Sequence, residues 1–252
     1  MRGRQLKLLT GKLYGRRRGQ LEEEGYSQGF QTIAGIDEVG MGPLAGPVVA
    51  AAVILPRHTS NRDIRDSKLL KAEKREELAF WIKENAVAWG VGVVDVEEID
   101  HINILRASLL AMASAFKQLN PVPDYLLIDG SHPIPLEFLT REATEKKAMS
   151  NRQEVLGEAE ILVLDASCPV AALPYQRTLK KGDRVCVSIA AASIVAKVAR
   201  DRIMMEYDRL YPEYGFGKHK GYSSSSHLTA LSRYGPSPIH RCSFRPVREC
   251  RL

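Results

Sequence analysis

The spacing of apolar residues predicts an alternation of strands and helices from about residue 31 onward. The run 47–55 is apolar at nearly every position, which indicates a strand buried on both faces, whereas 86–94 alternates. Glycine and proline between positions 40 and 46 favour a turn that makes the second strand antiparallel to the first. The five predicted strands are residues 33–37, 47–55, 86–94, 124–129 and 159–165.

Three segments carry the spacing and end signals of helices. Residues 71–84 have helical periodicity, and the segment 104–119 is preceded by a capping residue, Asn103, and followed by Pro121. A long segment, 188–211, is alanine-rich early and charged late, and we expect Ser188 to be its N-cap. Strands and helices mixed in this order predict an α/β layered domain.

The first thirty residues differ from the rest of the chain. They hold basic clusters and an acidic run but no sustained apolar period, so we expect 1–30 to be a flexible basic extension to a domain spanning 31–252. The basic triplet at 16–18 could contact phosphate, although a solvated tail explains the same composition.

Composition narrows the class of protein. The 252 residues carry a net charge of +6, which favours polyanionic partners such as nucleic acid. The four cysteines show no CxxC spacing and are read as free thiols in a reducing compartment. No apolar run approaches the ~18 residues of a membrane span, and no signal-peptide core is visible, so we expect a cytoplasmic protein without membrane contact.

Carboxylates stand where two predicted strands end. Asp37 and Glu38 follow the first strand, and Asp129 closes the fourth. Such strand ends gather ligand-binding groups in open α/β sheets, and hard cations such as Mg²⁺ or Mn²⁺ prefer carboxylate oxygens. Residues of this kind also cap turns, so the pattern alone supports a metal-dependent phosphoryl enzyme and an ordinary turn about equally.

Seven motifs, taken together and in order, resemble ribonuclease HII. They span about residues 33–247 and are GIDEVGMGPLAGPVV (35–49), DSKLL (66–70), YLLIDG (125–130), KGD (181–183), SIAAASIVAKVARDR (188–202), HKGY (219–222) and GPSPIHRCSF (235–244). The resemblance implies an RNase H-like fold: a five-stranded mixed sheet flanked by helices. It also implies a helical C-terminal part, from about residue 203, that helps to hold substrate.

The resemblance implies a function as well. Members of the family hydrolyse the RNA strand of RNA–DNA hybrids and incise duplex DNA on the 5′ side of a single ribonucleotide, leaving 3′-hydroxyl and 5′-phosphate ends. They use Mg²⁺ or Mn²⁺ in a two-metal mechanism and serve ribonucleotide excision repair. We expect this chain to act in the same way, as a monomer.

Four metal-binding carboxylates carry over from the family by position: Asp37, Glu38, Asp129 and Asp183. The interval from Asp129 to Asp183 is long, and Asp165 is a competing candidate at a more usual distance. Asp129 is favoured because its flanking residues and the following glycine match the family. The segment 133–164 is then an insertion.

Substrate-binding residues carry over in the same way: Gly40, Met41, Gly42, Lys68, Ser193, Lys197 and Tyr222. The glycine turn and Tyr222 would detect the ribose 2′-hydroxyl, which distinguishes RNA from DNA. Lys68, Ser193 and Lys197 would contact phosphates, although a lysine among small residues also suits solvent or a carboxylate. Met41 stands where the family usually has arginine, so we expect a lost phosphate contact there.

Two other functions remain open at this stage. The first is ribonuclease HIII, a related enzyme with the same core and a larger N-terminal domain than thirty residues would provide. The second is a non-catalytic protein that binds hybrids. If the protein cleaves hybrids and EDTA stops this cleavage by removing the metal, the non-catalytic binding protein is excluded.

Overall fold

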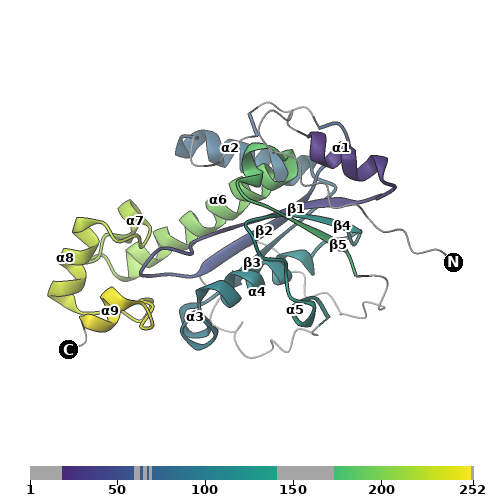
Figure 1. The fold of residues 1–252 in the computed structure, drawn as a ribbon. Helices are drawn as coiled ribbons and strands as arrows, with labels where there is room; N and C mark the ends of the chain where they lie inside the picture. Colours follow the sequence, from purple (N-terminus) through teal and green to yellow (C-terminus); the bar gives the residue numbers. More distant parts are fainter. Residues whose placement is uncertain (1–18, 60–62, 65–66, 68–69, 141–172, 251–252) are drawn as a thin grey trace.

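A five-stranded mixed sheet forms the centre of the computed structural model, which describes residues 19–59, 63–64, 67, 70–140 and 173–250 (Figure 1). The strands are β1 (Ile33–Val39), β2 (Val48–Ile54), β3 (Ala88–Val94), β4 (Tyr125–Asp129) and β5 (Tyr175–Leu179). Their order is β3-β2-β1-β4-β5, in which β2 is antiparallel to both neighbours and β4 is parallel to both of its own. The predicted α/β fold with a five-stranded mixed sheet is confirmed.

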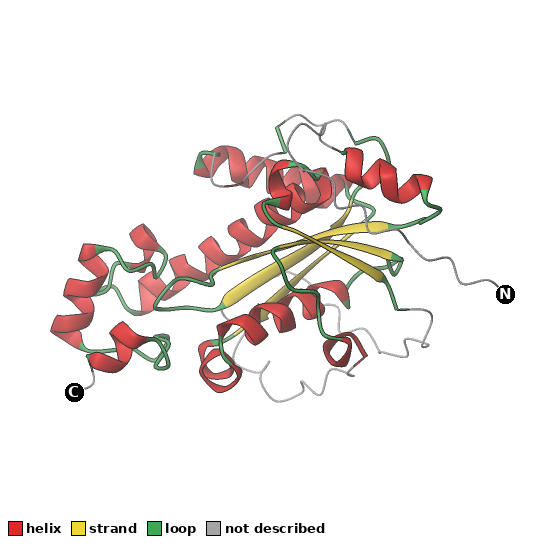
Figure 2. Cartoon of the chain, viewed as in Figure 1, coloured by secondary structure: helices red, strands yellow, loops and turns green. Residues whose placement is uncertain are grey.

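Helices cover both faces of the sheet and extend beyond one end (Figures 1 and 2). Helices α3, α4 and α5 lie on one face, α1, α2 and α6 on the other, and α7, α8 and α9 gather at the far end of α6. The bounds are α1 Gln20–Ser27, α2 Ala72–Asn85, α3 Val96–Ile102, α4 Ile104–Phe116, α5 Leu136–Thr140, α6 Val187–Leu210, α7 Phe216–His219, α8 Ser225–Tyr234 and α9 Arg245–Glu249. No helix in these described ranges is long and apolar enough to cross a membrane.

The two faces of β2 supply two hydrophobic cores. All seven of its residues are buried, as its continuous apolar run predicts, with Ala50 facing helix α4 and Ala51 facing helices α2 and α6. Helix α6 lies very close to β1, because a Cβ on Gly35 would come within 2.1 Å of the backbone carbon of Ser188. This close approach sets the first half of α6 over the end of β1, where the carboxylates lie.

The N-terminal boundary differs from the prediction. Residues 20–27 of the predicted flexible extension form helix α1, whose Leu21 is completely buried. Its Glu22 accepts hydrogen bonds from the backbone N–H (3.0 Å) and the hydroxyl (2.8 Å) of Ser188. The prediction that Ser188 is the N-cap of the long helix is therefore wrong: Cys186 holds that position, and Glu22 satisfies the Ser188 N–H instead. The basic triplet at 16–18 lies outside the described residues.

The fifth strand was not predicted. Strand β5 (Tyr175–Leu179) has the sequence YQRTL, which carries little apolar signal because it is a half-exposed edge strand. The predicted strand at 159–165, together with Asp165, lies outside the described residues. Of the predicted insertion at 133–164, residues 136–140 form α5, and the segment from 141 onward is likewise not described.

Candidate active site

Asp37 and Asp129 are brought to one edge of the sheet by neighbouring parallel strands. The register pairs Ile36 of β1 with Ile128 of β4, so the residue that follows each of them lies at the same carboxyl-terminal edge. Asp37 is only 6% exposed. Carboxyl ends of parallel strands gather functional groups in this way in open α/β sheets.

The Lys-Gly-Asp turn lies against the same edge. The backbone N–H of Gly182 donates a hydrogen bond to Oδ1 of Asp129 at 2.6 Å. Lys181 has a left-handed backbone, with φ of 60°, and leads into a short 3₁₀ helix, Gly182–Arg184, whose Asp183 is 8% exposed. Three chain segments therefore bring the four predicted carboxylates to one region of the molecule.

Negative charge accumulates at this edge. Burial, and then the charges of Glu38 and Asp129, raise the pKa of the Asp37 carboxyl well above its ordinary value. Hydrogen bonds from the Ser193 side chain and from the backbone N–H of Glu38, 2.8 Å from Asp37 Oδ1, act in the opposite direction. Carboxylates that repel one another in a buried place are the chemistry that a divalent cation neutralises.

The donor set suits a hard cation, because it consists of carboxylate oxygens without cysteine or histidine. Within the described ranges, however, no group of three or more histidine, cysteine, aspartate or glutamate side chains converges closely enough to hold a metal ion. The side chains as they stand thus provide the charge and the ligand type for Mg²⁺ or Mn²⁺, but not a closed cage.

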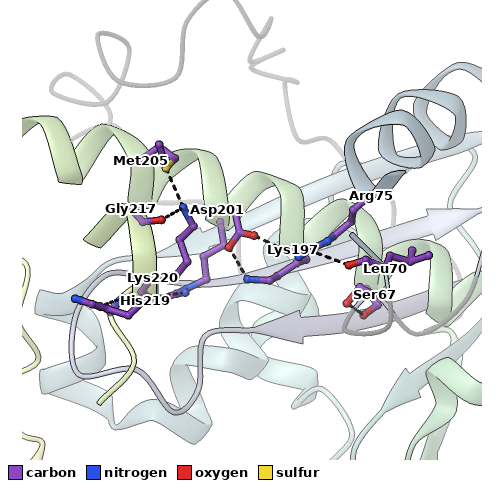
Figure 3. A network of polar contacts seen from close by, with 12 residues as sticks. Ser67, Leu70, Arg75, Lys197, Asp201, Met205, Gly217, His219 and Lys220 are labelled. Atoms are coloured by element: carbon purple, nitrogen blue, oxygen red, sulfur yellow. Dashed lines mark hydrogen bonds and ion pairs between the residues drawn. The ribbon is translucent and has the colours of Figure 1, made fainter. Parts of the chain in front are cut away.

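Ser193 and Lys197 lie one turn apart on helix α6, and Ser193 faces Asp37. Ser193 Oγ lies 2.9 Å from Ser67 Oγ and also bonds Asp37, so its hydroxyl supports the carboxylate directly. Lys197 forms an ion pair with Asp201, whose other oxygen lies 3.4 Å from Nη1 of Arg75 (Figure 3). The sequence left a phosphate, a carboxylate or solvent open as the partner of Lys197, and the structure shows the carboxylate of Asp201. Lys68 lies outside the described residues.

The Gly-Met-Gly turn and Tyr222 lie side by side. Gly40 has a positive φ of 100°, and a Cβ there would come within 2.4 Å of Nε of Arg200, so only glycine fits. A Cβ on Gly42 would lie 3.9 Å from Cε1 of Tyr222, whose side chain reaches the surface with 42% exposure. The two predicted ribose-contacting elements therefore share one surface, with Met41 between the glycines.

A relay of neutral histidines holds the backbone of Tyr222. Nδ1 of His240 accepts the backbone N–H of Ser237 (2.9 Å), so the ring proton of His240 is on Nε2. That proton points at Nε2 of His227 (3.0 Å), which leaves the His227 proton on Nδ1, where it meets the Tyr222 carbonyl (2.9 Å). We assign these tautomers from the donor at Ser237, which can only donate. Burial, and then the charge of His227, lower the pKa of His240 to about 4.

Two arginines were missed by the sequence analysis. Arg200 and Arg241 are completely buried, and their guanidinium groups donate to backbone carbonyl oxygens of the loop 40–47 and, from Arg200, of Lys220. Both lie within motifs on which the family resemblance rests. Arginine is mostly exposed in folded proteins, so each was expected at the surface. No local signal in the sequence marks them as buried.

Comparisons with known proteins agree with this geometry. Residues 34–247 match the sequence model of the ribonuclease HII family. The ribonuclease HII of Geobacter sulfurreducens is 50% identical over 228 residues, which cover 90% of this chain and 88% of that protein. The corresponding protein of Geobacter metallireducens is 51% identical over 221 residues, covering 88% and 87%.

A solved structure shows the same fold. The ribonuclease H2 of Pyrococcus horikoshii superposes with a TM-score of 0.62 at 24% identity, covering 87% of this chain and 97% of that one. The family match favours neither of the two other functions, ribonuclease HIII and a non-catalytic binding protein. The chain belongs to the ribonuclease HII family of metal-dependent endonucleases, which hydrolyse phosphodiester bonds of RNA in RNA–DNA hybrids.

Proposed function

We propose that this protein cuts RNA–DNA hybrids, and duplex DNA on the 5′ side of single ribonucleotides, by two-metal hydrolysis. Asp37, Glu38, Asp129 and Asp183 would hold Mg²⁺ or Mn²⁺. One observation carries the proposal: the carboxyl-terminal parts of β1 and β4 and the Lys-Gly-Asp turn meet at one edge. There burial, and then the charges of Glu38 and Asp129, raise the pKa of Asp37.

The protein groups have distinct tasks in this proposal. Ser193 and the Glu38 N–H fix the orientation of the Asp37 carboxylate, and the Gly182 N–H fixes that of Asp129. A bound pair of divalent cations would supply an activated water and neutralise the charge that develops on the phosphate. Burial of Asp37 and Asp183 limits the access of water to their oxygens and strengthens their interaction with positive charge.

Ribose selection would come from the adjoining surface. Backbone groups of the Gly40–Gly42 turn and the hydroxyl of Tyr222 would bond the 2′-hydroxyl of the nucleotide next to the cut. A deoxynucleotide would leave these polar groups without a partner, which costs about 1–3 kcal/mol for each buried group. The products would carry 3′-hydroxyl and 5′-phosphate ends.

Arg75 of helix α2 and Lys197 of helix α6 would bind the phosphate backbone of the nucleic acid. Lys197 and Arg75 share the carboxylate of Asp201, so this cluster keeps a net positive charge, one turn of α6 from Ser193. The net charge of +6 favours the same polyanionic partner. The monomeric state and the cytoplasmic location stay predictions.

Cleavage of an end-labelled RNA–DNA hybrid tests the proposal. We expect cutting with Mg²⁺ or Mn²⁺, none with excess EDTA, and a loss of more than about 100-fold in Asp37→Asn. Glu84→Gln is the matched control, because Glu84 is an exposed carboxylate on α2. Full activity of Asp37→Asn would contradict a metal-binding role for Asp37. So would a melting temperature so low that unfolding alone explains the lost activity.

A further inference from the structure

Arg200 and Arg241 are the largest completely buried side chains in the described part of the protein. No carboxylate there forms an ion pair with either guanidinium, and burial lowers the pKa of Arg200 to about 10 and that of Arg241 to about 9, so both stay charged at neutral pH. Burying a charge without a counter-ion is costly unless its hydrogen bonds are satisfied. Their position therefore calls for a specific reason.

Arg241 binds the inner side of the loop 40–47. Its Nη2 donates to the carbonyl oxygens of Gly40 (2.6 Å) and Gly46 (2.8 Å), its Nη1 to that of Met41 (3.1 Å), and its Nε again to Gly46 (2.9 Å). One planar guanidinium thus fixes both ends of the loop.

The orientation of these carbonyls determines where the loop presents its N–H groups. In a trans peptide the C=O and N–H of one unit point in opposite directions. Because Arg241 holds the carbonyls of Gly40 and Met41, the N–H groups of Met41 and Gly42 point away from Arg241. These are the backbone donors of the turn that we expect to meet the ribose.

Arg200 joins this loop to the turn that carries Tyr222. Its Nε and Nη2 donate to the carbonyls of Pro47 (3.0 Å) and Ala45 (3.2 Å), and its Nη1 donates to that of Lys220 (3.0 Å). The guanidinium carbon also lies 5.9 Å from the centre of the Tyr222 ring. The same side chain therefore contacts both elements that would sense the sugar.

We propose that Arg200 and Arg241 are positioning residues for ribose selection, which hold the N–H groups of Met41 and Gly42 at a fixed separation from Tyr222. Neither arginine touches substrate. The inference rests on the proposed function, because it assumes that this turn and Tyr222 bind the 2′-hydroxyl. It predicts that loosening either guanidinium lowers discrimination between ribose and deoxyribose more than it lowers binding of nucleic acid in general.

The test measures steady-state incision of a DNA duplex that contains one ribonucleotide. A duplex of the same sequence made only of DNA is added as a competitive inhibitor. The ratio of the inhibitor Ki to the substrate KM measures discrimination. In Arg200→Lys and in Arg241→Lys, which keep the charge but lose the fork of donors, we expect this ratio to fall about 10-fold, with Ki within about 2-fold of wild type. Arg202→Lys is the matched control on the same helix, because Arg202 is exposed and pairs with Glu76.

A third variant disturbs the same contact from the side of the loop, and thermal melts of all three variants identify any that fail to fold. Gly40→Ala keeps both arginines but places a Cβ within 2.4 Å of Arg200 Nε, and it should lower the ratio in the same way. An unchanged ratio in folded variants, or a rise in KM and Ki by the same factor, would overturn the inference. If the wild-type protein itself shows no incision or no discrimination, the proposed function fails instead.

Discussion

The backbone N–H of Gly182 lies 2.6 Å from Oδ1 of Asp129 and donates a hydrogen bond to it, although the two residues are 53 positions apart. This bond ties the Lys-Gly-Asp turn to the last residue of β4. It brings Asp183, which follows Gly182, to the edge of the sheet at which Asp37 lies on β1. The contact supports Asp129 as the partner of Asp183 in a shared metal site.

The first prediction compares Asp129→Asn with Asp165→Asn. We expect Asp129→Asn to reduce hybrid cleavage more than about 100-fold, because it removes a carboxylate from the edge, and Asp165→Asn to keep nearly full activity. Rates at saturating Mg²⁺, each beside a thermal melt, check this. The reverse outcome would show that the alignment of the third carboxylate is wrong.

The second prediction concerns Asp201. Burial lowers the pKa of Lys197, and the hydrogen bond and charge of Asp201 act against this. In Asp201→Asn the pKa of Lys197 should therefore fall further, so the lysine loses its proton at a lower pH. The uncharged lysine then binds phosphate more weakly. We expect KM to begin rising at a lower alkaline pH than in wild type.

Profiles of KM and kcat between about pH 7 and 10 distinguish weaker phosphate binding by Lys197, which changes KM, from a slower cleavage step, which changes kcat. The variant should keep its kcat near neutral pH. Asp63→Asn is a suitable control, because Asp63 pairs with Lys74 at an exposed site and not with Lys197. A KM profile that coincides with that of wild type would show that Asp201 does not tune Lys197.

The third prediction concerns stability in acid. His240 has a folded-state pKa of about 4, below its ordinary value, so the unfolded chain takes up a proton that the folded chain resists. Its contribution to the free energy of unfolding is therefore full above about pH 6.5, falls as the pH drops toward 4, and is constant below that. The loss is on the order of 3 kcal/mol.

Paired melts of wild type and His240→Gln between pH 7 and 4 measure this contribution. The variant should be less stable at pH 7, because the relay to Tyr222 is broken, and the difference between the two proteins should shrink toward pH 4. His132→Gln, at an exposed site, should melt in parallel with wild type. A difference that does not change with pH would mean that His240 does not resist protonation.

The fourth prediction concerns Met41, which is half-buried at the glycine turn. Met41→Arg adds a cation beside the expected phosphate path without altering the backbone carbonyls that Arg241 holds. We expect KM to fall several-fold at low salt, with the advantage lost as salt rises, and kcat to stay unchanged. Equal KM values for both proteins at all salt concentrations would contradict a phosphate contact there.

Local patterns in the sequence predicted the elements that carry a strong local signal. The apolar run of β2 is buried throughout, and Asn103 does cap α4, with its side chain accepting from the N–H groups of Leu105 and Arg106. Strand β5 was missed because an edge strand needs few apolar residues. Helix α1 was missed because a single side chain, Leu21, supplies its fully buried apolar anchor.

Long-range contacts explain what the sequence could not show at the site. The acceptors of Arg200 and Arg241 on the loop 40–47 lie between 153 and 201 positions away along the chain. Nothing near either arginine indicates that its guanidinium is enclosed by carbonyl oxygens. The strand-end carboxylates, by contrast, were recognisable because their position depends on elements that local patterns do predict.

Mapping the cut in a DNA duplex that contains one ribonucleotide tests the central claim most directly. With Mg²⁺ or Mn²⁺, the account predicts a single incision on the 5′ side of the ribonucleotide, with a 3′-hydroxyl on one product and a 5′-phosphate on the other. The all-DNA duplex should stay intact. Incision elsewhere, or cutting of long hybrids alone, would contradict the role given to the glycine turn and Tyr222.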